Sequence, residues 1–158
     1  MIFVTLGTQD KQFKRLLDAV EVIDVPEKII AQVGSTDFYS EKIEIHKYLD
    51  NETFDKYMKE ANVIITHAGV GTIIQGLKLG KKMIVAARLK EYNEHVNDHQ
   101  LQILESFSNE GYILPLENFD DLEILIKKNF TPKEFKSNQI NFATKLEHEI
   151  NKLTKKRR

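Results

Sequence analysis

The sequence predicts an α/β fold with a mostly parallel sheet flanked by helices. Short apolar runs rich in β-branched residues alternate with longer amphipathic segments over residues 1–115. This alternation is typical of β-α-β units, whose right-handed crossovers place helices on both faces of a sheet. The 158 residues suit one such domain with its own core. We therefore expect a single Rossmann-like domain, with its core over residues 1–115 and a helical extension over residues 118–158.

Six apolar runs are expected to form the strands. Residues 2–6 open the chain as a central strand, and the β-branched run at 63–65 suits a strand buried on both faces. Residues 42–46 alternate polar and apolar side chains, so we expect a more exposed strand there. The expected strands are 2–6, 29–33, 42–46, 63–65, 83–86 and 112–114, the last of them stopped by Pro115.

Apolar residues at helical spacing fill the intervals between these strands. The first helix is expected over residues 10–23, and the second carries Phe54, Tyr57, Met58 and Ala61 on its inner face. The third follows Gly71 and ends at Gly80, since glycine commonly follows a helix end. The fourth is expected over residues 96–107, with these side chains facing the core: Leu101, Leu104 and Phe107.

Residues 118–158 are expected to form a helical extension. Asn118 is expected to cap a helix that buries Leu122, Leu125 and Ile126. Residues 131–134 read Thr-Pro-Lys-Glu, a capping box with proline at the first helical position. The amphipathic helix that would follow carries Leu146, Ile150 and Leu153 and leads to a basic tail at 155–158. We expect this helix to pack on the domain, with a docking surface near an anionic membrane as the alternative.

Composition excludes several classes of protein. A net charge of −1 gives no reason to expect nucleic-acid binding by bulk electrostatics. The absence of cysteine rules out disulfides, thiolate metal sites and cysteine nucleophiles, and it fits a reducing cytoplasm. No apolar run approaches the roughly 20 residues of a membrane span, and the amino terminus lacks the basic region of a signal peptide.

A glycine turn after the strand at 63–65 is the first candidate for a ligand site. Gly69 and Gly71 stand between this strand and the third helix, so backbone N–H groups and the positive end of the helix dipole meet at one point that attracts phosphate. The motif is not specific. Ile74 occupies the third glycine position of a dinucleotide fingerprint, and no P-loop Gly-Lys-Ser/Thr follows. A plain tight turn is the alternative.

A polar loop after the strand at 83–86 is the second candidate. Because the carboxyl ends of parallel strands lie at one edge of the sheet, this loop and the glycine turn are expected to be neighbours. Together they predict a site for a phosphorylated ligand with hydroxyl groups, and a solvated connection is the alternative. The polar residues of the loop are Glu91, Glu94, His95, Asn97, Asp98, His99 and Gln100.

These segments carry a resemblance to a known family. The runs at 67–72 (His-Ala-Gly-Val-Gly-Thr), 80–85 (Gly-Lys-Lys-Met-Ile-Val) and 94–100 (Glu-His-Val-Asn-Asp-His-Gln) resemble the nucleotide-sugar-binding half of GT-B glycosyltransferases, and so does the opening Phe-Val-Thr-Leu-Gly-Thr at 3–8. Among such proteins, the chain resembles the short subunits of two-chain enzymes. These include the cytosolic subunit of the dolichol-linked N-acetylglucosaminyltransferase and bacterial capsule and exopolysaccharide subunits.

The resemblance implies roles for particular residues. It places the donor's nucleoside against Tyr48 and Leu49, with Gln75 where many relatives carry a glutamate that binds the ribose hydroxyls. For His67, the alternative to binding phosphate is a structural role. The sugar is expected at Asp98, His99 and Gln100. The residues expected to hold the diphosphate are Gly7, Thr8, His67, Gly69, Val70, Gly71 and Thr72.

The resemblance also implies a reaction. The chain is expected to be the donor-binding catalytic subunit that moves a sugar from a UDP-sugar to a lipid-linked acceptor in surface polysaccharide biosynthesis, with no cofactor and no obligatory metal. The acceptor site and the catalytic base are expected on a membrane-attached partner, with Glu94 and His95 as minority candidates for an in-chain base. Such a subunit would be cytoplasmic and peripheral at the inner face of the membrane.

Two other classes remain open from the sequence. A non-catalytic nucleotide or nucleotide-sugar-binding regulatory module would need the same glycine turn, although the cluster around Gln100 favours a ligand that includes a sugar. A UDP-sugar epimerase would need a second domain in the same chain, and the length of this chain argues against it.

Overall fold

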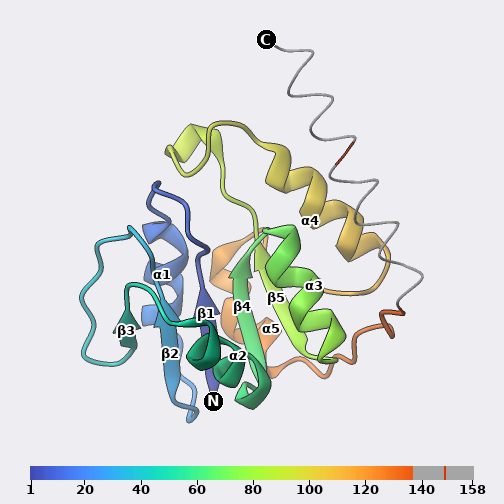
Figure 1. Cartoon of the computed structure of the whole chain (residues 1–158), viewed down its shortest axis with the longest axis horizontal. Helices are drawn as coiled ribbons and strands as arrows, with labels where there is room; N and C mark the ends of the chain where they lie inside the picture. The colour runs from blue at the N-terminus through green and yellow to red at the C-terminus, as the bar shows by residue number, and fades with distance from the viewer. Residues whose placement is uncertain (137–147, 149–158) are drawn as a thin grey trace.

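A computed structural model, which describes residues 1–136 and His148, has one six-stranded, all-parallel sheet (Figure 1). The strand order is β3-β2-β1-β4-β5-β6, so the predicted parallel sheet and the central place of the first strand are confirmed. The short β3 lies at one edge with partly exposed side chains, as its alternating sequence predicts. The strands are β1 Ile2–Thr5, β2 Ile29–Gln32, β3 Glu44–His46, β4 Val63–His67, β5 Lys82–Ala86 and β6 Leu114–Pro115.

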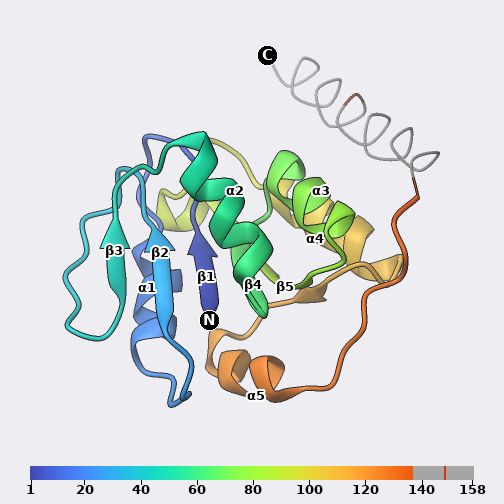
Figure 2. The same cartoon turned by 60° about the horizontal axis from the view of Figure 1, so that its bottom comes forward.

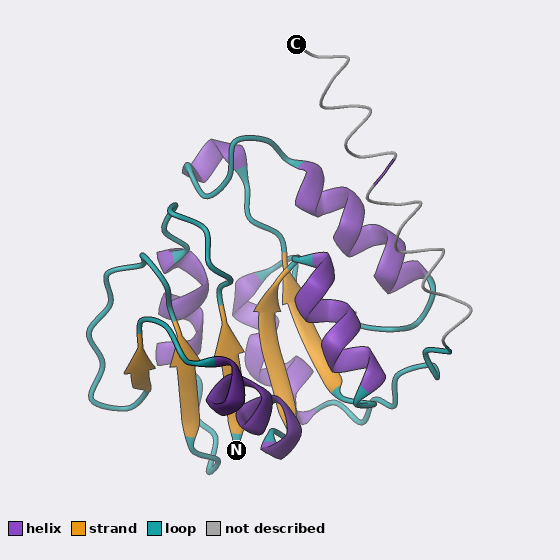
Figure 3. Cartoon of the chain, viewed as in Figure 1, coloured by secondary structure: helices purple, strands orange, loops and turns teal. Residues whose placement is uncertain are grey.

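Helices cover both faces of the sheet (Figures 2 and 3). Ile2 and Val4 of β1 face a core shared with α1 (Lys14–Glu21) and α5 (Leu122–Lys127), while Phe3 between them faces the opposite core. That second core is built with α2 (Asn51–Glu60), α3 (Val70–Lys78) and α4 (His99–Asn109). Because neighbouring residues of each strand enter different cores, these strands read as continuous apolar runs.

Two helices begin later than their apolar spacing predicts. The first helix starts at Lys14 rather than at residue 10, since the N–H of Phe13 donates to Thr36 Oγ1 at 3.0 Å and holds the chain non-helical there. The helix predicted from residue 96 starts at His99. Its inner face includes Ile103, whereas Leu101 is 46% exposed, so the prediction that Leu101 faces the core is wrong. A helix repeats every 3.6 residues, so positions spaced three apart rotate steadily around it. Leu101, six residues before Phe107, therefore lies outside the apolar face that Leu104 and Phe107 share.

The end of the domain corrects two further predictions. Pro115 does not stop the last strand but belongs to β6, which pairs only with β5 and so lies at an edge, where a missing N–H is tolerated. Asn118 caps as predicted, accepting the N–H of Asp120 at 3.1 Å, but it caps the 3-10 turn Phe119–Asp121 that precedes α5.

The predicted capping box is wrong, because residues 131–136 are not helical. The N–H of Lys133 instead donates to Gly111 O at 3.0 Å, and Phe135 packs edge-on against Tyr112 with ring centroids 5.5 Å apart. The predicted helix with Leu146, Ile150 and Leu153 and the basic tail lie outside the described residues. Within the described part of the chain, no helix is both long enough and apolar enough to cross a membrane.

Candidate functional site

The carboxyl edge of the sheet carries a pocket of about 460 Å³. It lies among the loop after β1 (the β1 loop, residues 6–13), the turn after β4 (the β4 turn, residues 67–72), and helices α2 and α3. Eight residues that the sequence predicts for the diphosphate and nucleoside line it, which confirms that they converge. The lining residues are Thr5, Gly7, Thr8, Gln9, Gln32, Leu49, Asn51, Phe54, Asp55, His67, Gly69, Gly71, Thr72 and Gln75.

The amino end of α3 opens into this pocket. Gly69 is the N-cap, with no side-chain capping bond, and the first helical hydrogen bond runs from Ile73 N–H to Gly69 O at 3.1 Å. The N–H groups before Ile73 therefore point out of the helix end, where the dipole is positive. A Cβ on Gly71 would meet nothing within 4 Å, so its backbone is open to a ligand. Val70 is 7% exposed and packs in the core, so it can act only through its backbone.

His67 is clamped between two glycines of the pocket. A Cβ on Gly7 would lie 2.5 Å from His67 Nε2, and one on Gly69 would lie 2.5 Å from His67 Cε1. These distances are too short for any side chain, so the imidazole ring requires glycine at both positions. Gly7 also has a φ of 78°, in the left-handed region that favours glycine. The ring thus occupies the floor of the pocket, beside the amino end of α3.

The protonation of His67 follows from its neighbours. Gln100 Oε1 accepts from the N–H groups of Ala68 (3.2 Å) and Arg88 (3.0 Å), which fixes the amide so that its Nε2 faces His67 Nδ1 at 3.3 Å. Because Gln100 Nε2 can only donate, His67 Nδ1 must accept, and the ring proton lies on Nε2. Burial, then the charges of Arg88 and His95, lowers the pKa of His67 to about 3. His67 is therefore a neutral N–H donor at neutral pH.

The nucleoside candidates lie farther from the helix end. Leu49 lines the pocket, but its N–H donates to Gln32 Oε1 at 2.8 Å and is already used within the protein. Tyr48 is 56% exposed, outside the pocket lining, with its hydroxyl 3.2 Å from Ser35 Oγ. Gln75 lines the pocket one turn beyond Thr72 and donates from Nε2 to Asp55 Oδ1 at 2.8 Å.

The three sugar candidates do not line the pocket. Gln100 is 4% exposed and holds the β4 turn, Arg88 and His67 together. Asp98 is exposed and accepts the N–H of Lys90 at 2.8 Å, while His99 is buried at the start of α4. Their contact with a sugar stays a prediction, and the bonds of Gln100 describe a brace behind His67.

Neither candidate base lines this pocket. Glu94 is 3% exposed, and both of its oxygens are engaged, with Arg15 at 2.9 and 3.1 Å and with the N–H of Leu89 at 3.0 Å. His95 is half-buried, and its Nδ1 accepts the N–H of Asn97 at 3.3 Å. Burial, then the charges of Arg88 and His99, lowers the pKa of His95.

Sequence reasoning gave no role to three residues that shape the site. Gln32 could have been found, since it is a polar residue at the end of an otherwise apolar buried strand. Arg88 is 1% exposed and donates to the carbonyls of Leu6, Lys11 and Glu94. Asp55 reads as an ordinary charged residue on the outer face of α2, so only the packing of α2 beside α3 brings it to Gln75. Among the described residues, no group of acidic or histidine side chains forms a metal site.

Solved structures share this fold at low sequence identity. CalG4, described as the calicheamicin glycosyltransferase, superposes with a TM-score of 0.60 at 13% identity over 94% of this chain and 38% of its own. A glycotransferase of kitacinnamycin gives a TM-score of 0.61 at 18% identity over 95% of this chain and 39% of its own. The domain therefore has the fold of one part of GT-B glycosyltransferases.

The family follows from the sequence comparison. Residues 1–156 match the model of the glycosyltransferase family 28 C-terminal domain, and the chain belongs to this family. One relative is the UDP-N-acetylglucosamine transferase subunit ALG13 of Candida albicans, 31% identical over 117 residues. The human protein of the same name is 27% identical over 125 residues. The matches cover 73% and 71% of this chain, but only 38% and 10% of those relatives.

Proposed function

We propose that this chain is the donor-binding component of a two-component glycosyltransferase. The observation that carries the proposal is the neutral His67, with its proton on Nε2, beside the open amino end of α3 in one pocket. Backbone N–H groups, a helix dipole and a neutral donor suit a diphosphate. When the sugar bond breaks, negative charge grows on the leaving diphosphate, and donors fixed before the reaction stabilise that charge.

The layout of the pocket supports an orientation for the donor. With the diphosphate at Gly71 and Thr72, the nucleoside would extend along α3 toward Gln75 and Asp55, with Phe54 beside them as an apolar surface. We assign Asp55 Oδ1 and Oδ2 as acceptors for the ribose hydroxyls. Asp55 then supplies the carboxylate that Gln75 lacks, and Gln75 orients it through the 2.8 Å hydrogen bond.

The relatives support a choice of donor and a partner. Both named relatives are UDP-N-acetylglucosamine transferase subunits, so a UDP-sugar, with UDP-N-acetylglucosamine first, is the proposed donor. The word subunit supports a second chain that completes the enzyme. We further propose that this partner chain is membrane-attached and presents a lipid-linked acceptor for surface polysaccharide synthesis. The component described here would join the partner at the inner face of the membrane.

The catalytic base is proposed to come from that partner. Glu94 is occupied by Arg15 and Leu89, and His95 lies outside the pocket lining. A base must accept the proton of the acceptor hydroxyl, and neither Glu94 nor His95 lines the donor pocket.

Calorimetric titration of the full chain with UDP and a panel of UDP-sugars, without added metal, tests the proposal. The panel comprises UDP-N-acetylglucosamine, UDP-glucose, UDP-galactose and UDP-glucuronic acid. Binding of UDP and of one sugar donor more tightly than the rest is expected. If neither UDP nor any of these sugars binds, with or without candidate partner chains, the donor-binding role is refuted.

A further inference from the structure

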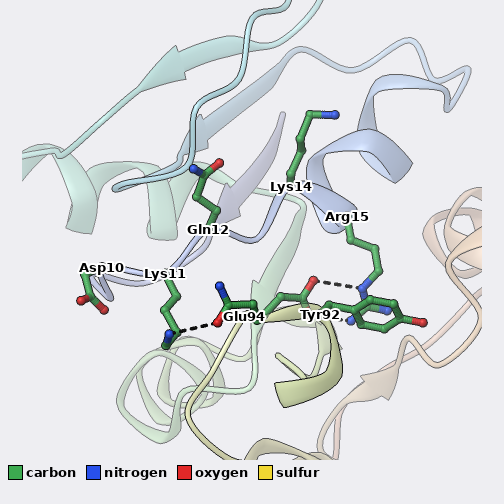
Figure 4. Close-up of a pocket in the computed structure, with 8 residues that line it drawn as sticks. Asp10, Lys11, Gln12, Lys14, Arg15, Tyr92 and Glu94 are labelled. Carbon is green, nitrogen blue, oxygen red and sulfur yellow. Dashed lines mark hydrogen bonds and ion pairs between the residues drawn. The ribbon is translucent and has the colours of Figure 1, made fainter.

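A second cavity lies beside the donor pocket, because the loop after β1 contributes to both. Figure 4 shows the residues that line this cavity. Its volume is about 560 Å³, and it opens between the β1 loop with the start of α1 on one side and the loop after β5 (the β5 loop, residues 87–98) on the other. Its charged lining residues are Asp10, Lys11, Lys14, Arg15 and Glu94. Neither the sequence motifs nor the donor pocket accounts for this cavity.

The walls of the cavity are held by buried contacts. The buried Arg88 donates to the carbonyls of Leu6 and Lys11 in the β1 loop and of Glu94 in the β5 loop. Arg15 binds Glu94 through two hydrogen bonds, and its guanidinium lies 4.4 Å from the ring centroid of Tyr92. Figure 4 shows Arg15 and Lys11 both reaching toward the Glu94 segment. The two walls are thus tied together without a ligand, and the cavity is preorganised.

The charges of the cavity favour an anion. Three cationic side chains line it against two carboxylates, and one of these, Glu94, is neutralised by Arg15. That leaves Lys11 and Lys14 against Asp10. Lys11 Nζ bonds only a neutral group in the contacts described, the Asn93 amide oxygen at 3.2 Å, and Lys14 pairs with Asp18 on the open surface, where such pairs are weak. Two ammonium groups can therefore turn to a ligand.

The position of the cavity indicates which anion it would bind. Gly7, Thr8 and Gln9 line the donor pocket, and the next three residues of the same loop line the second cavity. A molecule in the second cavity would therefore lie beside the diphosphate end of the donor, where the sugar leaves.

We propose that the second cavity binds a phosphate group of the acceptor, through Lys11 and Lys14, while the acceptor hydroxyl approaches the donor sugar across the β1 loop. This inference rests on the proposed function, since it takes the neighbouring pocket as the donor site. It makes the acceptor site a shared one: the partner holds the rest of the acceptor, and this chain holds its charged group.

The test uses a matched pair of probes on the full chain saturated with UDP. Glucose 1-phosphate and glucose differ only in the phosphate, and backbone amide NMR reports where each binds. Glucose 1-phosphate is expected to shift the amides of Lys11, Gln12 and Asn93, and glucose is not. The double variant Lys11→Gln/Lys14→Gln is expected to weaken glucose 1-phosphate binding about tenfold or more, because both charge-assisted contacts are lost. Its UDP affinity should stay within about twofold, because neither lysine lines the donor pocket.

A control variant removes two exposed lysines elsewhere, Lys78→Gln/Lys127→Gln, and is expected to keep glucose 1-phosphate binding unchanged. If UDP binds but glucose 1-phosphate shifts none of these amides, or if the Lys11/Lys14 variant binds it as well as the wild type, the inference is overturned and the donor role stands. If that variant selectively weakens UDP-glucuronic acid relative to UDP-glucose, the cavity takes a carboxylate of the donor, which also overturns it. Failure of UDP itself to bind refutes the proposed function instead.

Discussion

The β4 turn and the β5 loop leave neighbouring strands at the same edge of the sheet, yet they use their polar groups differently. The β4 turn presents backbone N–H groups and Gly71 to open space. The polar side chains of the β5 loop and the first turn of α4 instead form hydrogen bonds within the protein. Glu94 bonds Arg15 and Leu89, and Asp98 bonds Lys90. Gln100 bonds Ala68, Arg88 and His67.

This difference shows that a dense run of polar residues predicts hydrogen bonds, but not whether they are made within the protein or to a ligand. The β5 loop must cross the edge of the sheet without a regular ladder, so its buried backbone groups need side-chain partners. The β4 turn enters a helix directly, so its N–H groups have no helical acceptor and remain for a ligand. Substitutions of the buried polar residues in the β5 loop should therefore lower stability, whereas substitutions in the β4 turn should weaken ligand binding.

The largest expected effect is on folding, at Arg88. Replacing Arg88 by Met leaves the carbonyls of Leu6, Lys11 and Glu94 without their buried donor, and we expect a loss of about 3–5 kcal/mol in the free energy of unfolding. Urea unfolding measures it. Lys90→Met, at an exposed position of the same loop, is the control and should change stability by less than about 0.5 kcal/mol. Equal effects of the two variants would contradict the role of Arg88 as the tie between the loops.

The β4 turn should show the opposite behaviour. Gly71→Asp places a carboxylate at the helix end where the diphosphate is proposed to bind, so UDP affinity should fall about 100-fold, or about 2.7 kcal/mol. The fold should be kept, since a Cβ there meets nothing within 4 Å. Gly71→Ala adds the Cβ without the charge and should cost only a few-fold in affinity. Calorimetry and urea unfolding on both variants check this, and a variant that unfolds while the Ala control does not would argue against an open site.

The contrast also explains what could be predicted from the sequence. The parallel sheet, its central first strand and the convergence of Gly7, His67 and Gly71 follow from alternation and from the geometry of parallel sheets, which are local signals plus one general rule. The partners of Gln100 and Asp55 depend on side chains that meet across 20 or more residues of chain. Periodicity carries no information on such meetings, and so the brace behind His67 and the Gln75–Asp55 pair could not be read from it.

His67 of the β4 turn contacts Gln100 in the first turn of α4. The pH dependence of stability tests whether these surroundings hold His67 neutral. In the unfolded chain its pKa is about 6.5, and in the folded protein burial lowers the pKa to about 3. Below pH 6.5 the unfolded state therefore binds a proton that the folded state does not. The stabilisation is complete above pH 6.5 and is lost as the pH falls toward 3, by about 1.4 kcal/mol per pH unit.

Between pH 6.5 and 5 this amounts to about 2 kcal/mol. Urea unfolding at several pH values measures it, with His67→Asn as the variant expected to lack this slope. His148→Asn changes an exposed histidine and should keep the wild-type slope. An unchanged slope in His67→Asn would mean that His67 is not held neutral by its surroundings.

The smallest expected effect is on UDP affinity at the Gln75–Asp55 pair, and it tests the assignment of Asp55 as the ribose ligand. Asp55→Asn should weaken UDP about five-fold, or about 1 kcal/mol, because an amide accepts from the ribose hydroxyls less strongly than a carboxylate. The same variant should bind 2′-deoxy-UDP with less change, since one hydroxyl contact is already absent. Lys56→Gln, at the next position of α2, is the control and should leave both affinities unchanged.

Gln75→Glu tests whether Asp55 or position 75 supplies the carboxylate that binds the ribose. With Asp55 Oδ1 only 2.8 Å from the Gln75 amide, a glutamate at position 75 would set two carboxylates against each other, so the single variant should not tighten UDP binding. Gln75→Glu combined with Asp55→Asn keeps one carboxylate and one amide in exchanged positions and should bind UDP about as well as the wild type. Tighter binding by Gln75→Glu alone would mean that position 75, and not Asp55, is where the ribose is held.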